Sequence, residues 1–103
     1  MEKLVRDKIP EIMEAAGVKC NYRIANEAEF KDALWEKLSE EFNEFTENPC
    51  EEEAADVLTV MIAIIEEHYG ECEISIASVL DAYSKKAIER GKFNKRIIAK
   101  FDK

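Results

Sequence analysis

The sequence has few of the residues that form tight turns, and it lacks the glycine-rich loops that bind nucleotides. Its 103 residues include only three glycines and two prolines. A protein built of many strands needs many turns, so this composition favours a few long helices. Neither a P-loop pattern nor a dinucleotide-binding G-x-G-x-x-G pattern occurs. Any chemistry on phosphate groups must therefore use other residues.

Long apolar runs and paired cysteines are also missing. The longest apolar run, residues 57–65, is interrupted by Thr59 and is far shorter than the ~20 residues that span a bilayer. The first residues contain no apolar core segment, so we expect no cleaved leader and no membrane partner. Cys20, Cys50 and Cys72 form no C-x-x-C pair and are odd in number. This pattern predicts reduced thiols and a cytoplasmic protein.

Positive charge is scarce relative to negative charge. The chain has 23 Asp and Glu against 15 Lys and Arg, for a net charge of −8 at pH 7. An acidic surface repels nucleic-acid backbones, so we expect no duplex nucleic acid as a partner. The only histidine, His68, has no cysteine or histidine at the spacing of a zinc site, and we expect it to be a surface or capping residue. The length predicts one domain, residues 1–103.

The spacing of apolar residues predicts an all-α fold, a compact bundle of about four helices. The first helix begins around Ile9-Pro10, and Gly17 ends it. The other three helices are expected over residues 27–46, 51–69 and 76–90. Asn48-Pro49 turns the chain between the second and third helices, which predicts a central antiparallel helical hairpin. The tail, residues 93–101, is expected to be either a short strand or an extended arm.

Two of these helices carry apolar surface that needs a partner. The third predicted helix is apolar almost all round between Val57 and Ile65, and such a helix must be covered on several sides. We therefore expect it to lie at the centre of the bundle and also to meet a partner chain. The fourth helix is expected to turn one stripe inward, made of Ile76, Val79, Leu80, Tyr83 and Ala87.

Four carboxylates flank the helix breaker symmetrically. Glu41 and Glu44 precede it, Glu53 and Asp56 follow it, and the i, i+3 spacing places each pair on one helix face. Folding of the hairpin would bring the two pairs together, where they would repel each other. Mg²⁺, or Mn²⁺, prefers carboxylate oxygens and would remove the conflict. The alternative is that these acidic side chains only face solvent, because glutamate is common on exposed helix surfaces.

Basic residues gather at two places in this acidic chain. Lys86, Arg90 and Lys92 lie near the end of the fourth predicted helix, and Arg6 and Lys8 lie near the start of the chain. Arginine binds phosphate oxygens in pairs and lysine binds them as a point charge. These five side chains are therefore candidates for binding a phosphate-containing substrate. The alternative for the later group is complementation of the helix dipole beside a solvated tail.

Together these motifs resemble the all-α nucleoside triphosphate pyrophosphohydrolases, or MazG-like enzymes. These enzymes are related to dimeric dUTPases and to phosphoribosyl-ATP pyrophosphohydrolase. The family's E-E-x-x-E and E-x-x-D motifs correspond here to residues 40–44 and 53–56. A compact subgroup also begins with K-L-V-R-D-K-I-P and ends with E-R-G-x-F-x-K-R-I, which correspond to residues 3–10 and 89–97.

The resemblance implies a Mg²⁺-dependent enzyme with a house-cleaning role. It also implies a homodimer or homotetramer, in keeping with the apolar surface of the third predicted helix. The enzyme would cleave noncanonical or surplus nucleoside triphosphates between the α and β phosphates, giving a monophosphate and pyrophosphate. The four carboxylates would hold the metal, and Glu40 or Glu41 would position or deprotonate the attacking water. Two alternatives stay open: a biosynthetic enzyme like phosphoribosyl-ATP pyrophosphohydrolase, and a non-catalytic helical module that binds a partner through its third helix.

Overall fold

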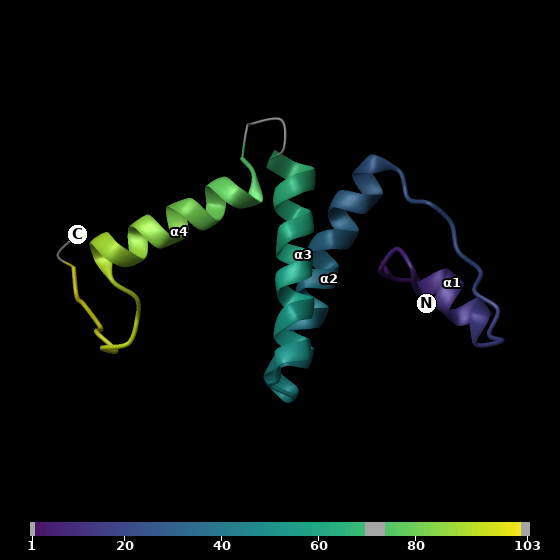
Figure 1. The fold of residues 1–103 in the computed structure, drawn as a ribbon, viewed down its shortest axis with the longest axis horizontal. Helices are drawn as coiled ribbons and strands as arrows, with labels where there is room; N and C mark the ends of the chain where they lie inside the picture. The colour runs from purple at the N-terminus through teal and green to yellow at the C-terminus, as the bar shows by residue number, and fades with distance from the viewer. Residues whose placement is uncertain (1, 70–73, 102–103) are drawn as a thin grey trace.

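The chain is all-helical, and the residues that the structure describes contain no strand. The computed structural model describes residues 2–69 and 74–101. The helices are α1 (Ile9–Ala15), α2 (Glu27–Glu47), α3 (Glu51–Tyr69) and α4 (Ile76–Arg90), shown in Figure 1. The predicted all-α fold of four helices is therefore confirmed. The described residues that follow α4 form no strand. They make a turn, in which the backbone N–H of Arg96 donates to Phe93 O at 3.2 Å, and residues 97–101 then continue as an irregular arm.

The composition led us to expect no membrane span and reduced thiols. None of the four described helices combines the length and the apolarity that a membrane crossing requires. Cys20 and Cys50 are free thiols. Cys72, the third cysteine, lies outside the described residues.

The helix ends follow local signals in the sequence. Pro10 lies in the first turn of α1, where a missing N–H breaks no helical hydrogen bond, and Gly17 follows the helix with φ of 81°. The Asn26 side chain accepts a hydrogen bond of 2.9 Å from the backbone N–H of Glu29. Ser75 caps α4 through a reciprocal pair of hydrogen bonds with the third residue of the helix. Each cap satisfies backbone groups that a helix end leaves free.

The antiparallel hairpin of α2 and α3 carries the core of the chain. Asn48 ends α2 and Pro49 prevents the helix from continuing, so α3 runs back beside α2 (Figure 1). Leu34 of α2 is 2% exposed and packs with Val60 and Ile64 of α3. Burial of these side chains fixes the register of the hairpin, and the register decides which polar residues meet.

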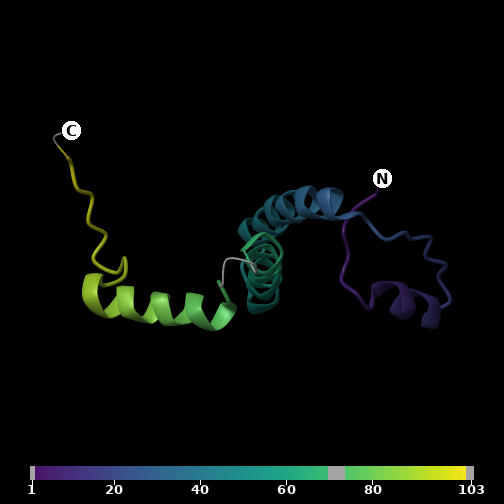
Figure 2. The same cartoon turned by 90° about the horizontal axis from the view of Figure 1, so that it is seen from above.

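Helix α4 extends away from the hairpin (Figures 1 and 2). The radius of gyration is 17.9 Å, whereas a fully compact chain of this length has about 13 Å. Leu80 and Tyr83 of α4 were predicted to face inward, but both are exposed. That prediction is wrong for these two residues because no described helix of the same chain covers this face of α4.

The segment before α1 crosses the hairpin and is held by ion pairs. Lys3 Nζ lies 3.1 Å from Glu40 Oε1 on α2, and Arg6 Nη2 lies 2.7 Å from Asp56 Oδ1 on α3. Exposed ion pairs of this kind contribute only about 0–1 kcal/mol each. Leu4 of the same segment also packs against the core of Leu34, Val60 and Ile64, so apolar burial adds to these ion pairs.

Candidate metal centre

Three of the four predicted metal ligands come together between α2 and α3, near the turn of the hairpin. One oxygen from each of Glu41, Glu53 and Asp56 lies within 4.8 Å of the other two. In an octahedral Mg²⁺ site, two ligands on opposite sides of the ion are about 4.2 Å apart. Neighbouring ligands of such an ion are about 3 Å apart, so small movements of these side chains would let one small, hard cation contact all three oxygens. Carboxylates are the ligands that such a cation prefers.

Glu41 is the buried member of this acidic cluster. The residue is only 6% exposed. Its Oε1 lies 3.2 Å from the ammonium of Lys37, one helical turn earlier on α2. Its Oε2 is buried and has no hydrogen-bond partner among the described residues. A buried carboxylate oxygen without a partner is costly, and a bound cation would supply the missing partner.

Glu53 is the member of the cluster whose pKa reflects the repulsion between the acids. Partial burial raises the pKa of its carboxyl group, and the charges of Glu44, Asp56 and Glu41 raise it further. Its Oε2 is also buried without a hydrogen-bond partner. No lysine or arginine of residues 2–69 and 74–101 forms an ion pair with Glu53. Glu53 is therefore the carboxylate that would gain most from a positive ion.

The remaining predicted acids lie beside the cluster. Glu44, the fourth predicted ligand, is exposed and acts on the cluster through its charge, which raises the pKa of Glu53. Glu40, a predicted catalytic residue, accepts from Lys3 at 3.1 Å and from Lys37 at 3.3 Å. The hydrogen bond from Lys3 lowers the pKa of Glu40, so this group stays ionised to lower pH than an ordinary glutamate.

Lys37 links the acids of α2. Its pKa is raised above the ordinary value: burial lowers it, but hydrogen bonds to Glu41 and Glu40 outweigh that effect. Sequence reasoning did not select Lys37, although its i, i+4 spacing to Glu41 is a standard signal for a helical ion pair. Thr59 was also missed as a site residue, and it accepts a hydrogen bond of 3.2 Å from Arg6.

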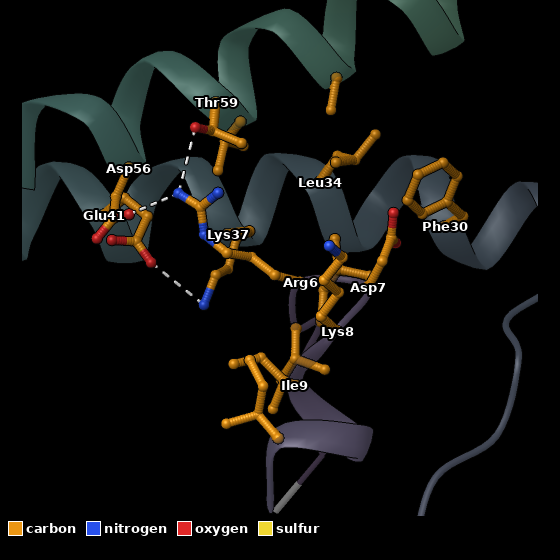
Figure 3. Close-up of a pocket in the computed structure, with 15 residues that line it drawn as sticks. Arg6, Asp7, Lys8, Ile9, Phe30, Leu34, Lys37, Glu41, Asp56 and Thr59 are labelled. Carbon is orange, nitrogen blue, oxygen red and sulfur yellow. Dashed lines mark hydrogen bonds and ion pairs between the residues drawn. The ribbon is translucent and has the colours of Figure 1, made fainter.

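A pocket of about 570 Å³ opens beside the acidic cluster (Figure 3). The segment before α1 and the beginning of α1 form one wall, and α2 and α3 form the others. Glu41 and Asp56 lie at one end of the pocket, whereas Phe30, Leu34 and Ile9 give it an apolar lining elsewhere. This volume is within the range of about 300–1,000 Å³ that small-molecule sites occupy. The pocket therefore combines an apolar surface with a charged end.

Two of the five predicted phosphate-binding residues line this pocket. Arg6 and Lys8 both contribute to its wall, together with Lys37. Arg6 points at the acidic cluster, where its Nη2 donates 2.7 Å to Asp56 Oδ1 and 3.2 Å to Thr59 Oγ1 (Figure 3). These cations stand where an anionic ligand in the pocket would meet them.

The other three predicted phosphate-binding residues lie far from the pocket in the same chain. Lys86 and Arg90 are in the last turns of α4, and Lys92 follows that helix, at the end that points away from the hairpin (Figure 1). The ammonium of Lys92 lies 5.9 Å from the centre of the Tyr83 ring. The structure thus brings Arg6 to the cluster and Lys8 to the same pocket, but not these three.

Comparisons with known proteins do not assign the chain to a family. No protein-family model, no curated protein and no solved structure matches it. The features of the chain that indicate a function are its carboxylates, its cations and its pocket.

Proposed function

We propose that this protein is a divalent-metal-dependent nucleotide pyrophosphohydrolase of the MazG-like type. Its substrates would be noncanonical or surplus nucleoside triphosphates, cleaved to a monophosphate and pyrophosphate. The observation that carries the proposal is the cluster of Glu41, Glu53 and Asp56, whose oxygens lie within 4.8 Å of one another. A buried, unpartnered oxygen of Glu41 adds to it. Exposed acidic groups on helices are common without a bound metal. The buried, unpartnered Oε2 of Glu41 distinguishes this cluster from them.

The residues fit Mg²⁺ or Mn²⁺ by ligand type and spacing. A divalent cation held there would activate water and offset the negative charge that develops on the phosphates. In this proposal Glu41, Glu53 and Asp56 bind the cation, and Glu44 contributes its charge from the rim. Because all four are acids, the cluster is poorly suited to an anionic phosphate until a cation is bound.

The pocket accounts for the rest of a nucleotide. Arg6, at the charged end of the pocket, and Lys8, further along its wall, would bind phosphate oxygens (Figure 3). The apolar surface of Phe30 and Ile9 would contact the flat base and exclude water from it. Of the two predicted catalytic carboxylates, Glu41 borders the pocket, so it is better placed than Glu40 to position the attacking water.

We also propose that the protein acts as a homodimer or homotetramer. The strongly acidic hairpin region 27–69 has only two Lys or Arg residues, Lys31 and Lys37. In residues 85–100, by contrast, Lys and Arg far outnumber Asp and Glu. On α3, Leu58 and Met61 are exposed apolar residues. The hairpin of a second copy would therefore offer α4 both apolar surface and complementary charge. Lys86 and Arg90 would reach an acidic cluster only across such an interface.

The test is hydrolysis of a panel of canonical and noncanonical nucleoside triphosphates in the presence of Mg²⁺. Pyrophosphate and orthophosphate are assayed separately. We expect pyrophosphate release by the wild type, and loss of turnover in Glu53→Gln and Asp56→Asn. Glu52→Gln, which makes the same charge change on an exposed neighbour, should keep activity. Full activity in both cluster variants would contradict the proposed site.

The same panel separates the two alternatives. A phosphoribosyl nucleotide hydrolysed far faster than any nucleoside triphosphate would indicate a biosynthetic enzyme. A helical interaction module would show no turnover and no binding of Mg²⁺ or Mn²⁺ in calorimetry. Release of orthophosphate alone would exclude cleavage between the α and β phosphates.

A further inference from the structure

The ion pair between Arg6 and Asp56 connects the N-terminal segment to the acidic cluster. Arg6 Nη2 lies 2.7 Å from Asp56 Oδ1 and 3.2 Å from Thr59 Oγ1 (Figure 3). The Arg6 side chain is more than half exposed, so it can move without disturbing the core. Asp56 is at the same time one of the three residues whose oxygens are arranged to hold a cation. Two different positive charges can therefore bind to one carboxylate.

The cations that the protein itself supplies neutralise only part of the cluster. Lys37 pairs with Glu41 at 3.2 Å and Arg6 pairs with Asp56 at 2.7 Å, while Glu53 has no ion-pair partner among the described residues. A divalent cation bound by all three carboxylates would lie within a few ångströms of the guanidinium on Asp56. Charges of the same sign at that separation repel strongly. Metal binding would therefore weaken the bond between Arg6 and Asp56.

A released Arg6 has an alternative partner close by. Its side chain lines the pocket of about 570 Å³, next to Lys8. A guanidinium can donate two parallel hydrogen bonds to a phosphate group. We propose that Arg6 is an exchangeable counter-ion, which neutralises Asp56 in the metal-free protein and binds the phosphates of a nucleotide once a divalent cation occupies the cluster. This inference rests on the proposed function and deepens it.

Because of this exchange, replacement of Arg6 should have opposite effects on the binding of the metal and of the nucleotide. Arg6 competes with the metal for Asp56, so its removal strengthens metal binding. It also donates to phosphate, so its removal weakens nucleotide binding. If Arg6 only held the N-terminal segment in place, its replacement would weaken nucleotide binding through loss of the pocket wall. It would not strengthen metal binding, because the three carboxylates lie on α2 and α3.

The experiment is calorimetric titration of Mn²⁺ alone into the wild type, Arg6→Gln and Lys31→Gln. Lys31 pairs with Glu27 at 3.3 Å on α2, so its replacement makes the same charge change away from the cluster. We expect Arg6→Gln to bind Mn²⁺ about threefold to fivefold more tightly than the wild type, because the ion pair that the metal must displace is exposed. Lys31→Gln should match the wild type. Thr59→Val, which keeps Arg6 but removes one of its two acceptors, should shift the affinity in the same direction by a smaller factor.

A second measurement follows the nucleotide. With the substrate found in the hydrolysis panel and saturating Mn²⁺, Arg6→Gln should raise KM by about tenfold or more, and Lys31→Gln should leave it unchanged.

The outcomes separate the two proposals. Mn²⁺ binding that is equal or weaker in Arg6→Gln than in the wild type would overturn the exchange and leave the metal centre intact. If neither the wild type nor Arg6→Gln binds Mn²⁺, the metal centre itself is wrong, and the exchange is wrong with it. An unchanged KM in Arg6→Gln would remove the phosphate-binding half of the exchange.

Discussion

Addition of Mn²⁺ should raise the melting temperature of the protein, and Glu53→Gln should abolish that rise. The cluster exists only in the folded hairpin, because the unfolded chain does not hold Glu41 near Glu53. A ligand that binds only the folded state at 100 times its Kd stabilises that state by about 2.7 kcal/mol. For a chain of roughly 100 residues, 1 kcal/mol shifts the melting temperature by roughly 4–8 °C. The expected rise is therefore roughly 11–22 °C.

The variant also has an expected effect without metal. Partial burial, and then the charges of neighbouring acids, raise the pKa of Glu53, which means that its ionised form destabilises the fold. Glu53→Gln should thus melt at a higher temperature than the wild type in the presence of a chelator, yet gain nothing from Mn²⁺. Glu52→Gln is the matched control: it removes one exposed acid from the same turn of α3, and it should keep the metal-dependent rise.

Thermal denaturation followed by far-ultraviolet circular dichroism, at constant ionic strength, measures both effects. An equal Mn²⁺-dependent rise in Glu52→Gln and Glu53→Gln would refute the reasoning, because it would show that the cation acts on the acidic surface in general. The same holds if the wild type shows no rise at millimolar Mn²⁺.

Three further predictions concern the packing and titration of the hairpin. Leu34→Ala should lower the free energy of unfolding by roughly 2–5 kcal/mol, since Leu34 is 2% exposed; Ile24→Ala, at an exposed position, should change it by no more than about 0.5 kcal/mol in urea denaturation. Because the pKa of Glu53 is raised above 4.5, the stability cost of its ionised form is full above the folded pKa and disappears as the pH falls below 4.5. The advantage of Glu53→Gln over the wild type should therefore be largest at pH 7 and vanish near pH 4, and an advantage independent of pH would contradict the assignment. Trp35→Phe should cost about 1 kcal/mol, because it removes the hydrogen bond of 3.1 Å from Trp35 Nε1 to His68 Nε2; no loss of stability would show that water replaces this bond fully.

The helices could be predicted from the sequence because their signals are local. Apolar spacing defined α3, and the breaker Asn48-Pro49 defined the turn of the hairpin. The approach of Glu41 to Glu53 and Asp56 followed from that turn and from the i, i+3 spacing. A site that joins two helices connected by a short turn is accessible to such reasoning, because few registers bury the apolar faces of both.

Other parts depend on contacts between segments far apart in the chain. An apolar stripe on α4 shows that a surface needs cover, but it does not say what covers it, so the exposure of Leu80 and Tyr83 could not be foreseen. Nothing in the spacing of Arg6 and Asp56 predicts that they meet. His68 was expected at the surface or as a cap, whereas the structure places it against the indole of Trp35.

That indole also gives the protein a built-in optical sensor. Trp35 is the only tryptophan in the chain, so long-wavelength fluorescence comes from a single place, the open end of the hairpin remote from its turn. Any effector that splays α2 from α3 would break the bond to the imidazole and increase contact of the ring with water. Emission spectra of the unlabelled protein would therefore report such opening directly.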